Sequence, residues 1–196
     1  VCDADGFNPR PLLKSSQPIM SPVWTPDGSH IMYVSFEHYR AAIYSQDWST
    51  GKRSLVSKSP GINNAPAISP KGNQMALVLS KTGFLKLYLL NMTTHQLKQL
   101  TKGPSIDTEP AFTPNGRYLL FTSDRGGGPQ IYRYDLSNGR IERMTYDGNY
   151  NARARVLPDG LGFVMMHRQD GLFSIAKQSF IDGQLQVLAP AGRDES

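Results

Sequence analysis

T-E-P-A-F-T-P-N-G, at Thr108–Gly116, is one copy of a unit that recurs along this chain at a fixed interval. Earlier copies are P-V-W-T-P-D-G at Pro22–Gly28 and P-A-I-S-P-K-G at Pro66–Gly72, and a degenerate copy, A-R-V-L-P-D-G, follows at Ala154–Gly160. The final glycines of the four copies, at positions 28, 72, 116 and 160, are spaced 44 residues apart. A repeat of about 40–45 residues that carries strands is the sequence signature of a β-propeller blade.

Each copy of the unit is followed by the same order of strands and turns. A Pro-x-Gly turn comes first, because glycine tolerates the positive φ of a tight hairpin. Second strands are then expected at 31–36, 75–79, 118–122 and 162–166, third strands at 42–45, 86–91, 130–135 and 172–177, and fourth strands at 52–57, 96–101, 140–145 and 184–189. The sequence therefore predicts an all-β fold, a β-propeller of four-stranded antiparallel blades with a 44-residue repeat.

The repeat also predicts the domain organisation. Residues 1–196 are expected to form one partial β-propeller without a second domain, with about four blades over residues 20–190 and the end strand of a preceding blade in residues 1–14. A closed propeller has four to eight blades. Because residues 1–14 are expected to end a further blade, we favour part of a six-bladed ring over a self-closed ring of four. An open arc would expose unpaired blade faces unless another segment covers them.

Composition excludes several classes of protein. The net charge of +5 and pI of about 9.4 are compatible with acidic partners, but the Lys and Arg residues are scattered along the chain. Neither zinc-finger spacing nor a basic helix accompanies them, so nucleic acid is not an expected partner. The sequence has no run of about 18 apolar residues, which argues against membrane insertion. The single cysteine, Cys2, does not determine the compartment.

Motifs for chemistry are scarce. The sequence has neither a Gly-x-Ser-x-Gly elbow nor a phosphate-binding loop, and Gly126–Gly128 lacks the Lys-Ser/Thr that such a loop needs. The four histidines fall in different repeats, and none forms a His-x-x-x-His pair. We therefore expect no catalytic residue, no metal site, no cofactor and no enzyme activity.

One set of loops is a candidate binding surface. The connections from a fourth strand to the next first strand, at 17–21, 59–65, 103–109 and 147–155, should open at the mouth of the central channel, where a rigid scaffold can present binding residues. The residues alone fit ordinary solvated loops equally well. Arg153 and Arg155 offer bidentate donors for carboxylates. The candidate partner-binding residues are Met20, Ser21, Asn63, Asn64, Ala65, Asp107, Thr108, Glu109, Arg153 and Arg155.

Three stretches together resemble one family. L-S-K-T-G at Leu79–Gly83, T-E-P at Thr108–Pro110 and T-S-D-R-G-G at Thr122–Gly127 are similar to the propeller domain of the TolB family, which belongs to the Tol–Pal system of Gram-negative bacteria. The similarity runs over essentially all 196 residues. The resemblance implies a periplasmic, non-enzymatic six-bladed propeller that follows an N-terminal α/β domain outside this chain.

The resemblance also implies partners. TolB propellers bind the lipoprotein Pal at the channel mouth, colicins imitate that contact, and the system supports outer-membrane integrity and cell division. Contact with TolA is expected only in the N-terminal region outside this chain. Asn63–Ala65 and Thr108–Glu109 match the Pal-contact loops. Thr108 and Glu109 are expected to supply the central contacts, and the small side chain of Ala65 should let the partner approach closely.

Two other classes remain open on the residues. The gating propeller of a prolyl-oligopeptidase-like serine peptidase uses similar turns, but it would require a hydrolase domain with a serine elbow elsewhere in the protein. A WD40-like scaffold should carry a Gly-His…Trp-Asp signature, which this sequence lacks.

Overall fold

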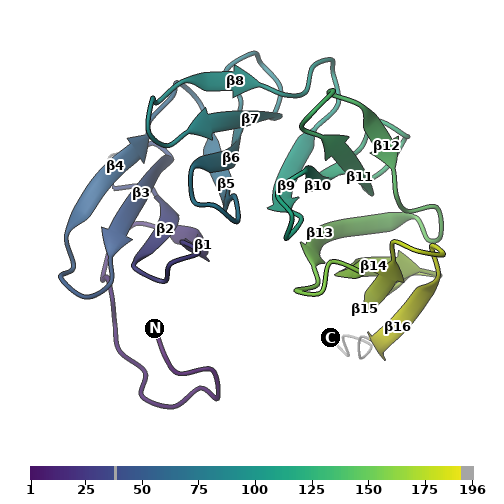
Figure 1. The fold of residues 1–196 in the computed structure, drawn as a ribbon, viewed down its shortest axis with the longest axis horizontal. Coiled ribbons are helices and arrows are strands. Elements are labelled where there is room, and N and C mark those ends of the chain that lie inside the picture. The colour runs from purple at the N-terminus through teal and green to yellow at the C-terminus, as the bar shows by residue number, and fades with distance from the viewer. Residues whose placement is uncertain (38, 191–196) are drawn as a thin grey trace.

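The computed structural model describes residues 1–37 and 39–190 and contains sixteen strands in four sheets. Each sheet has four antiparallel strands in chain order, and we call the sheets blades 1 to 4. Figure 1 shows the blades side by side along an arc that stays open between blade 1 and blade 4. The first strand of each blade lies on the inside of the arc (Figure 1). The predicted propeller of four-stranded antiparallel blades is therefore confirmed.

The strands recur at closely matching positions in every blade. Blade 1 comprises β1 (Ile19–Trp24), β2 (His30–Ser35), β3 (Ala42–Asp47) and β4 (Arg53–Ser57). Blade 2 comprises β5 (Asn63–Ile68), β6 (Gln74–Leu79), β7 (Lys86–Asn91) and β8 (Leu97–Gln99). Blade 3 comprises β9 (Asp107–Phe112), β10 (Tyr118–Ser123), β11 (Gln130–Asp135) and β12 (Ile141–Arg143). Blade 4 comprises β13 (Tyr150–Val156), β14 (Gly162–Gln169), β15 (Leu172–Ser179) and β16 (Leu185–Pro190).

Two features differ from the sequence-based expectation. Residues 1–14 form a turn and irregular segments that pair with no strand of this chain, so their place as the end strand of a preceding blade stays a prediction. Near its end the segment reaches β3, where the Gln46 amide donates to the Leu12 carbonyl at 3.3 Å. The outer strands of blades 2 and 3 are shorter than expected, and in blade 2 Leu100 and Thr101 both donate to the Leu87 carbonyl, which ends the regular ladder.

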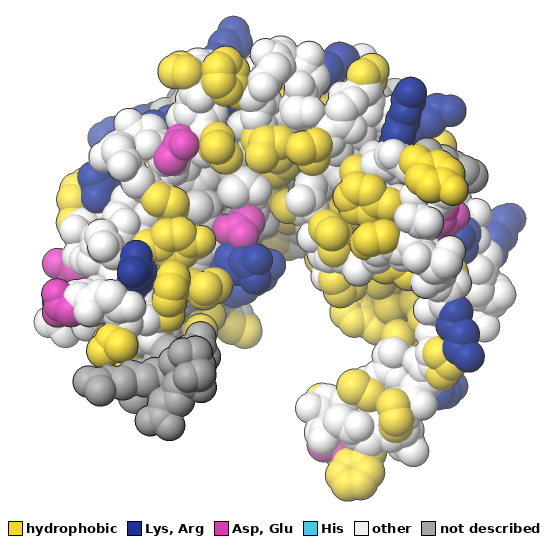
Figure 2. Space-filling model, turned by 180° about the vertical axis from the view of Figure 1, so that it is seen from behind, with side chains coloured by type: hydrophobic (Ala, Val, Ile, Leu, Met, Phe, Trp, Pro, Cys, Tyr) yellow, Lys and Arg dark blue, Asp and Glu magenta, His cyan; other side chains and the backbone are white. Residues whose placement is uncertain are grey.

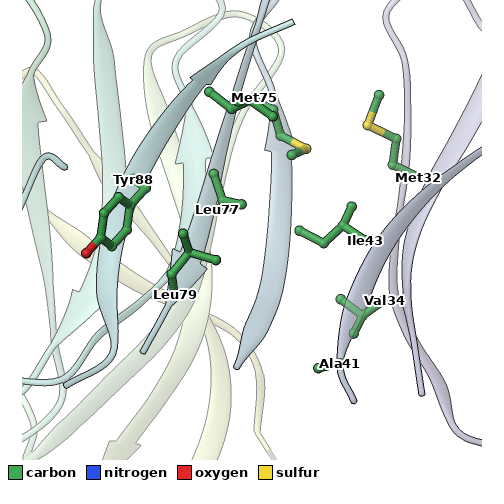
Figure 3. Packing of buried hydrophobic residues seen from close by; sticks show 9 residues of the cluster. Met32, Val34, Ala41, Ile43, Met75, Leu77, Leu79 and Tyr88 are labelled. Atoms are coloured by element: carbon green, nitrogen blue, oxygen red, sulfur yellow. The ribbon is translucent and has the colours of Figure 1, made fainter. Parts of the chain in front are cut away.

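The hydrophobic core lies between neighbouring blades. Met32, Val34 and Ile43 of blade 1 face Met75 and the leucines of β6 (Figure 3). The opposite face of β6 packs its alanine and valine against blade 3. Both faces of a middle strand are thus covered, so β6 is buried at every position from Met75 to Leu79 rather than at alternate positions.

Among the described residues, none forms a helix with the length and apolar character needed to cross a lipid bilayer. The repeated glycines that end the Pro-x-Gly turns have φ values of 69° to 73°. This conformation favours glycine over other residues, so the turns of the repeat form as predicted.

The turn after β3 provides a test by pH. The Asp47 carboxylate accepts hydrogen bonds from the backbone N–H of Thr50 and from the hydroxyl and N–H of Ser49, which lowers the pKa of Asp47 to about 2. Because the folded pKa lies below the unfolded value, this contribution to stability is complete above about pH 4 and is lost as pH falls toward 2. An NMR titration of the Asp47 carboxyl should therefore give a midpoint near 2.

The repeat itself shows which substitution of Asp47 the turn can accept. Asn91 occupies the equivalent turn after β7, and its amide oxygen accepts the N–H groups of Thr93 and Thr94 at 2.9 Å. Asp47→Asn should thus keep the turn, because asparagine accepts the same hydrogen bonds. The free energy of unfolding of the variant should fall less between pH 4 and 2 than that of the wild type, as measured by urea unfolding at several pH values. A midpoint at or above 3.8 in the wild-type titration would contradict the expectation.

Candidate functional site

The innermost strand of every blade carries a β-bulge at the same repeat position. In blade 2, Asn64 pairs with Val78 and Ala67 pairs with Ala76, so two residues of β5 lie opposite one residue of β6. The same shift occurs in the other three blades. The first bulged residue has positive φ in each blade: Ser21 (53°), Ala65 (46°), Glu109 (55°) and Arg153 (58°).

Proline follows the first bulged residue in three of the blades. Pro22, Pro66 and Pro110 stand at these positions, and Ala154 stands there in blade 4. Proline has no N–H, so it leaves no backbone donor unpaired where the bulge interrupts the ladder. The repeated proline of the sequence therefore has a structural role at the bulge.

The four bulged strands enclose a cavity of about 730 Å³ on the inside of the arc. Eight of the ten predicted partner-binding residues line it: Met20, Ser21, Asn64, Ala65, Thr108, Glu109, Arg153 and Arg155. They lie within β1, β5, β9 and β13, so their expected position in connecting loops is wrong. The repeat placed them on the inside of the arc because equivalent positions of each blade face the same centre.

The other two predicted residues do not reach the cavity. Asn63 is fully buried, and its amide donates to the carbonyls of Ala41 and Ser59 at 3.0 and 2.7 Å. Asp107 is also fully buried, between Lys86 and Arg125. Both residues join their strand to the preceding blade, so we correct their assignment from binding to structure.

Asp107 accepts hydrogen bonds on both carboxylate oxygens. Lys86 Nζ lies 2.9 Å from Oδ2, and Arg125 Nη2 lies 2.9 Å from Oδ1. Burial raises the pKa of the Asp107 carboxyl, but hydrogen bonds from Ser123, Arg125 and Lys86 outweigh it and leave the pKa below 3.8. The carboxylate is therefore charged at neutral pH and fixes the start of β9, which carries Thr108 and Glu109.

Hydrogen bonds join the bulges of neighbouring blades across the cavity wall. The Ser21 hydroxyl donates to the Asn64 amide oxygen at 3.2 Å, which links blades 1 and 2. Arg153 donates its backbone N–H and its Nε–H to the two oxygens of Glu109, each at 3.0 Å, which links blades 3 and 4. The cavity wall is therefore held by direct contacts between its lining residues.

Sequence reasoning missed the apolar part of the lining. Val23, Ala67 and Phe112 contribute to the wall, and they follow the repeated proline in the same strands. The signal that could have found them is the repeat itself, because the two positions after the proline are apolar in blades 1 to 3.

Among the residues that the structure describes, no group of three or more His, Cys, Asp or Glu side chains could hold a metal ion. The charged lining of the cavity comprises two arginines and one glutamate, and Arg153 already pairs with that glutamate. The cavity wall can thus offer hydrogen bonds, one net positive charge and apolar contacts.

Comparison with known proteins matches this chain to one family. The model of the TolB beta propeller domain matches residues 1–196. A relative named Tol-Pal system protein TolB, from Coxiella burnetii, is 66% identical over 65 residues, which cover 33% of this chain and 15% of the relative. The chain thus aligns with only a small part of that relative's length.

Solved structures agree with the fold. The crystal structure of TolB from Acinetobacter baumannii superposes with a TM-score of 0.93 at 44% identity, covering 100% of this chain and 49% of that protein. The chain therefore spans about half the length of that TolB. A puromycin-hydrolysing peptidase from Mycobacterium tuberculosis superposes with a TM-score of 0.75 at 16% identity, covering 96% of this chain and 31% of the peptidase. That likeness shows the fold alone.

Proposed function

The chain belongs to the TolB β-propeller family, and from this premise we propose that it acts in the periplasm as a non-enzymatic protein-binding propeller whose central cavity binds the lipoprotein Pal. The observation that carries the proposal is the cavity of about 730 Å³, where eight predicted partner-binding residues come together from four blades. Named relatives belong to the Tol-Pal system, which supports the choice of partner.

The cavity suits a protein partner on physical grounds. Its wall is built on paired strands and fixed by contacts between bulges, so little reorganisation would accompany binding. Hydrogen-bonding groups such as Thr108 line the same cavity as apolar groups such as Val23 and Ile68. Such a mixed wall can receive a loop or a helix end with both polar and apolar side chains.

The remaining expectations follow from this proposal. The arc would be part of a six-bladed ring completed by residues outside this chain, and residues 1–196 would belong entirely to the propeller. Colicins would compete with Pal for the same cavity, and TolA would bind elsewhere. Binding of Pal would connect the protein to outer-membrane integrity and cell division. The peptidase alternative is weaker, because its support is a shared fold at 16% identity.

The test introduces a bulky cation into the cavity. Thr108 is half-buried in the cavity wall, so Thr108→Lys should fill space that the partner needs and weaken Pal binding by at least about tenfold. The measurement is calorimetric titration of Pal from the same organism into this chain and into the full-length protein. Thr93→Lys is the matched control, because Thr93 is exposed in the turn after β7, outside the cavity.

Ala65→Val is a poor test even though Ala65 lines the cavity. Ala65 has φ of 46°, and a β-branched residue at positive φ is strained, so valine would disturb the bulge as well as the surface. Thr108 lies outside the positive-φ position and avoids this problem. Equal affinity of Thr108→Lys and Thr93→Lys for Pal, with wild-type folding, would refute binding in the cavity.

A further inference from the structure

Charge is distributed unevenly around the cavity wall. Arg153 and Arg155 belong to blade 4, and Glu109 of blade 3 is the remaining charged residue among those that line the cavity. The repeat positions that match Arg155 in blades 1 to 3 hold Val23, Ala67 and Ala111. Blade 4 is therefore distinct from the other blades that the structure describes in presenting two cations to the cavity.

Glu109 is already occupied by its neighbours. Its Oε2 accepts the Thr122 hydroxyl at 2.8 Å and the Arg153 N–H at 3.0 Å, and its Oε1 accepts Arg153 Nε–H at 3.0 Å. The Glu109 side chain is 24% exposed. We therefore assign Glu109 the role of positioning Arg153, in place of the direct partner contact expected from the sequence.

The two arginines keep donors directed to the cavity. The Arg153 side chain is 67% exposed, and its Nη groups have no partner within residues 1–37 and 39–190. Arg155 donates one Nη–H to the Ala154 carbonyl at 3.0 Å. Ala152 and Ala154 are buried, so the two arginines share the opposite face of β13 and line the same wall.

The wall formed by blades 1 and 2 has different chemistry. It carries no charged side chain: Val23, Ala65 and Ala67 line it with small apolar side chains, and the polar groups of Ser21 and Asn64 bond to each other. Figure 2 shows basic side chains beside an acidic one at the inner edge of the arc. A ligand in the cavity would therefore meet two arginines on one side and an uncharged, largely apolar surface on the other.

We propose that Arg153 and Arg155 bind the carboxylate of an aspartate or glutamate side chain on the polypeptide that enters the cavity, while apolar side chains of that polypeptide lie on β1 and β5. This inference rests on the proposed function and deepens it. Arginine presents a planar fork of N–H donors that matches a carboxylate, and Glu109 holds one fork in place. The uneven wall would select a segment that carries a negative charge and would also fix the orientation in which that segment binds.

The first experiment is calorimetric titration of Pal into the 196-residue chain and its variants. Arg155→Gln should weaken binding by about tenfold, and the affinity of the variant should depend less steeply on salt than that of the wild type. Arg153→Lys keeps the charge but loses the Nε–H contact with Glu109, so it should weaken binding by a smaller factor. Arg140→Gln is the matched control, because Arg140 is exposed in the turn before β12 and makes the same charge change outside the cavity.

A second experiment does not depend on Pal. Acetyl-Ala-Asp-Ala-amide and acetyl-Ala-Asn-Ala-amide differ only in the carboxylate, and NMR can follow the Nε–H signals of the two arginines as each peptide is added. The aspartyl peptide should shift both signals, and the asparaginyl peptide should leave them unchanged. Arg155→Gln should abolish the response that the aspartyl peptide produces in the remaining arginine signal.

The outcomes separate the two proposals. If the wild type binds Pal and Arg155→Gln binds it equally well, this inference is wrong and the proposed function stands. If Pal does not bind but the aspartyl peptide shifts the arginine signals, the choice of partner is wrong and the carboxylate site stands. If Pal does not bind and the aspartyl peptide leaves both arginine signals unchanged, both proposals fail.

Discussion

Lys86→Met is expected to lower the free energy of unfolding by about 3 kcal/mol, because it leaves the buried carboxylate of Asp107 without one of its two cations. The side chains of Lys86 and Asp107 are 1% and 0% exposed, and Nζ lies 2.9 Å from Oδ2. Removing one partner of a buried ion pair typically costs about 3–5 kcal/mol. We expect the lower end of that range, since Arg125 still donates to the other oxygen of Asp107.

The Lys86 ammonium also holds the loop before β9. It donates to the hydroxyl of Ser105 at 3.0 Å and to the carbonyl of the same residue. Methionine has a similar length but no donor, so the packing changes little while these contacts are lost. The variant should therefore also loosen the start of β9, where Thr108 enters the cavity wall.

Urea unfolding followed by circular dichroism measures this loss. Lys98→Met is the matched control, because Lys98 is exposed on β8, and it should change stability by less than about 0.5 kcal/mol. Equal stability of the two variants would show that Lys86 contributes no more than a surface lysine. Hydrogen exchange should locate the loosened segment at residues 105–109 in the Lys86 variant.

The sequence predicts the blades well because their signal is local and repeated. A proline, a glycine turn and the strands around them recur every 44 residues, and each copy gives an independent prediction of the same structure. The strand expected in residues 1–14 has no pairing partner among the strands of this chain, and a local pattern alone does not supply one. The shortened β8 has a similar origin, since Thr101 leaves the ladder when its hydroxyl accepts the Leu87 N–H.

The candidate site was only partly predictable, because the bulges depend on pairing between strands. Ala65 and Glu109 read as loop residues in the sequence, whereas the register with β6 and β10 places them inside strands with positive φ. Asp107 looked like a polar loop residue for the same reason. Its partner Lys86 lies 21 positions earlier in another blade. The repeat shows that this contact is systematic. The positions that match Lys86 and Asp107 in the next pair of blades hold Gln130 and Asn151, whose side chains also contact each other.

Phe121→Ala is expected to lower the free energy of unfolding by about 3–5 kcal/mol, because it opens a cavity between blades 2 and 3. Phe121 is fully buried, its ring centroid lies 5.9 Å from that of Tyr132, and the Arg125 guanidinium lies 5.2 Å from the ring centroid. Phe121 also stands opposite the bulge at Glu109, between the pairs that flank it. The substitution therefore removes packing from the strand pair that forms the cavity wall.

Two control variants show whether the loss of stability comes from lost packing in the core. Phe121→Leu keeps most of the apolar volume and should cost about 1.5 kcal/mol or less. Phe7→Ala removes a ring that is 69% exposed, and it should change stability by less than about 0.5 kcal/mol. A loss for Phe121→Ala no greater than that for Phe7→Ala would contradict the role assigned to this contact between blades.

The same variant tests whether the blades unfold together. The two tryptophans, Trp24 and Trp48, both lie in blade 1 with their ring centroids 6.4 Å apart, so fluorescence reports on that blade alone. Phe121 belongs to blade 3, while circular dichroism averages over the whole arc. The continuous packing of blade 1 on blade 2 and of blade 2 on blade 3 should couple them, and both probes should then shift to the same lower urea midpoint. A fluorescence midpoint that stays at its wild-type value would show instead that each blade depends only on its neighbours, as repeat arrays do when their cooperativity is weak.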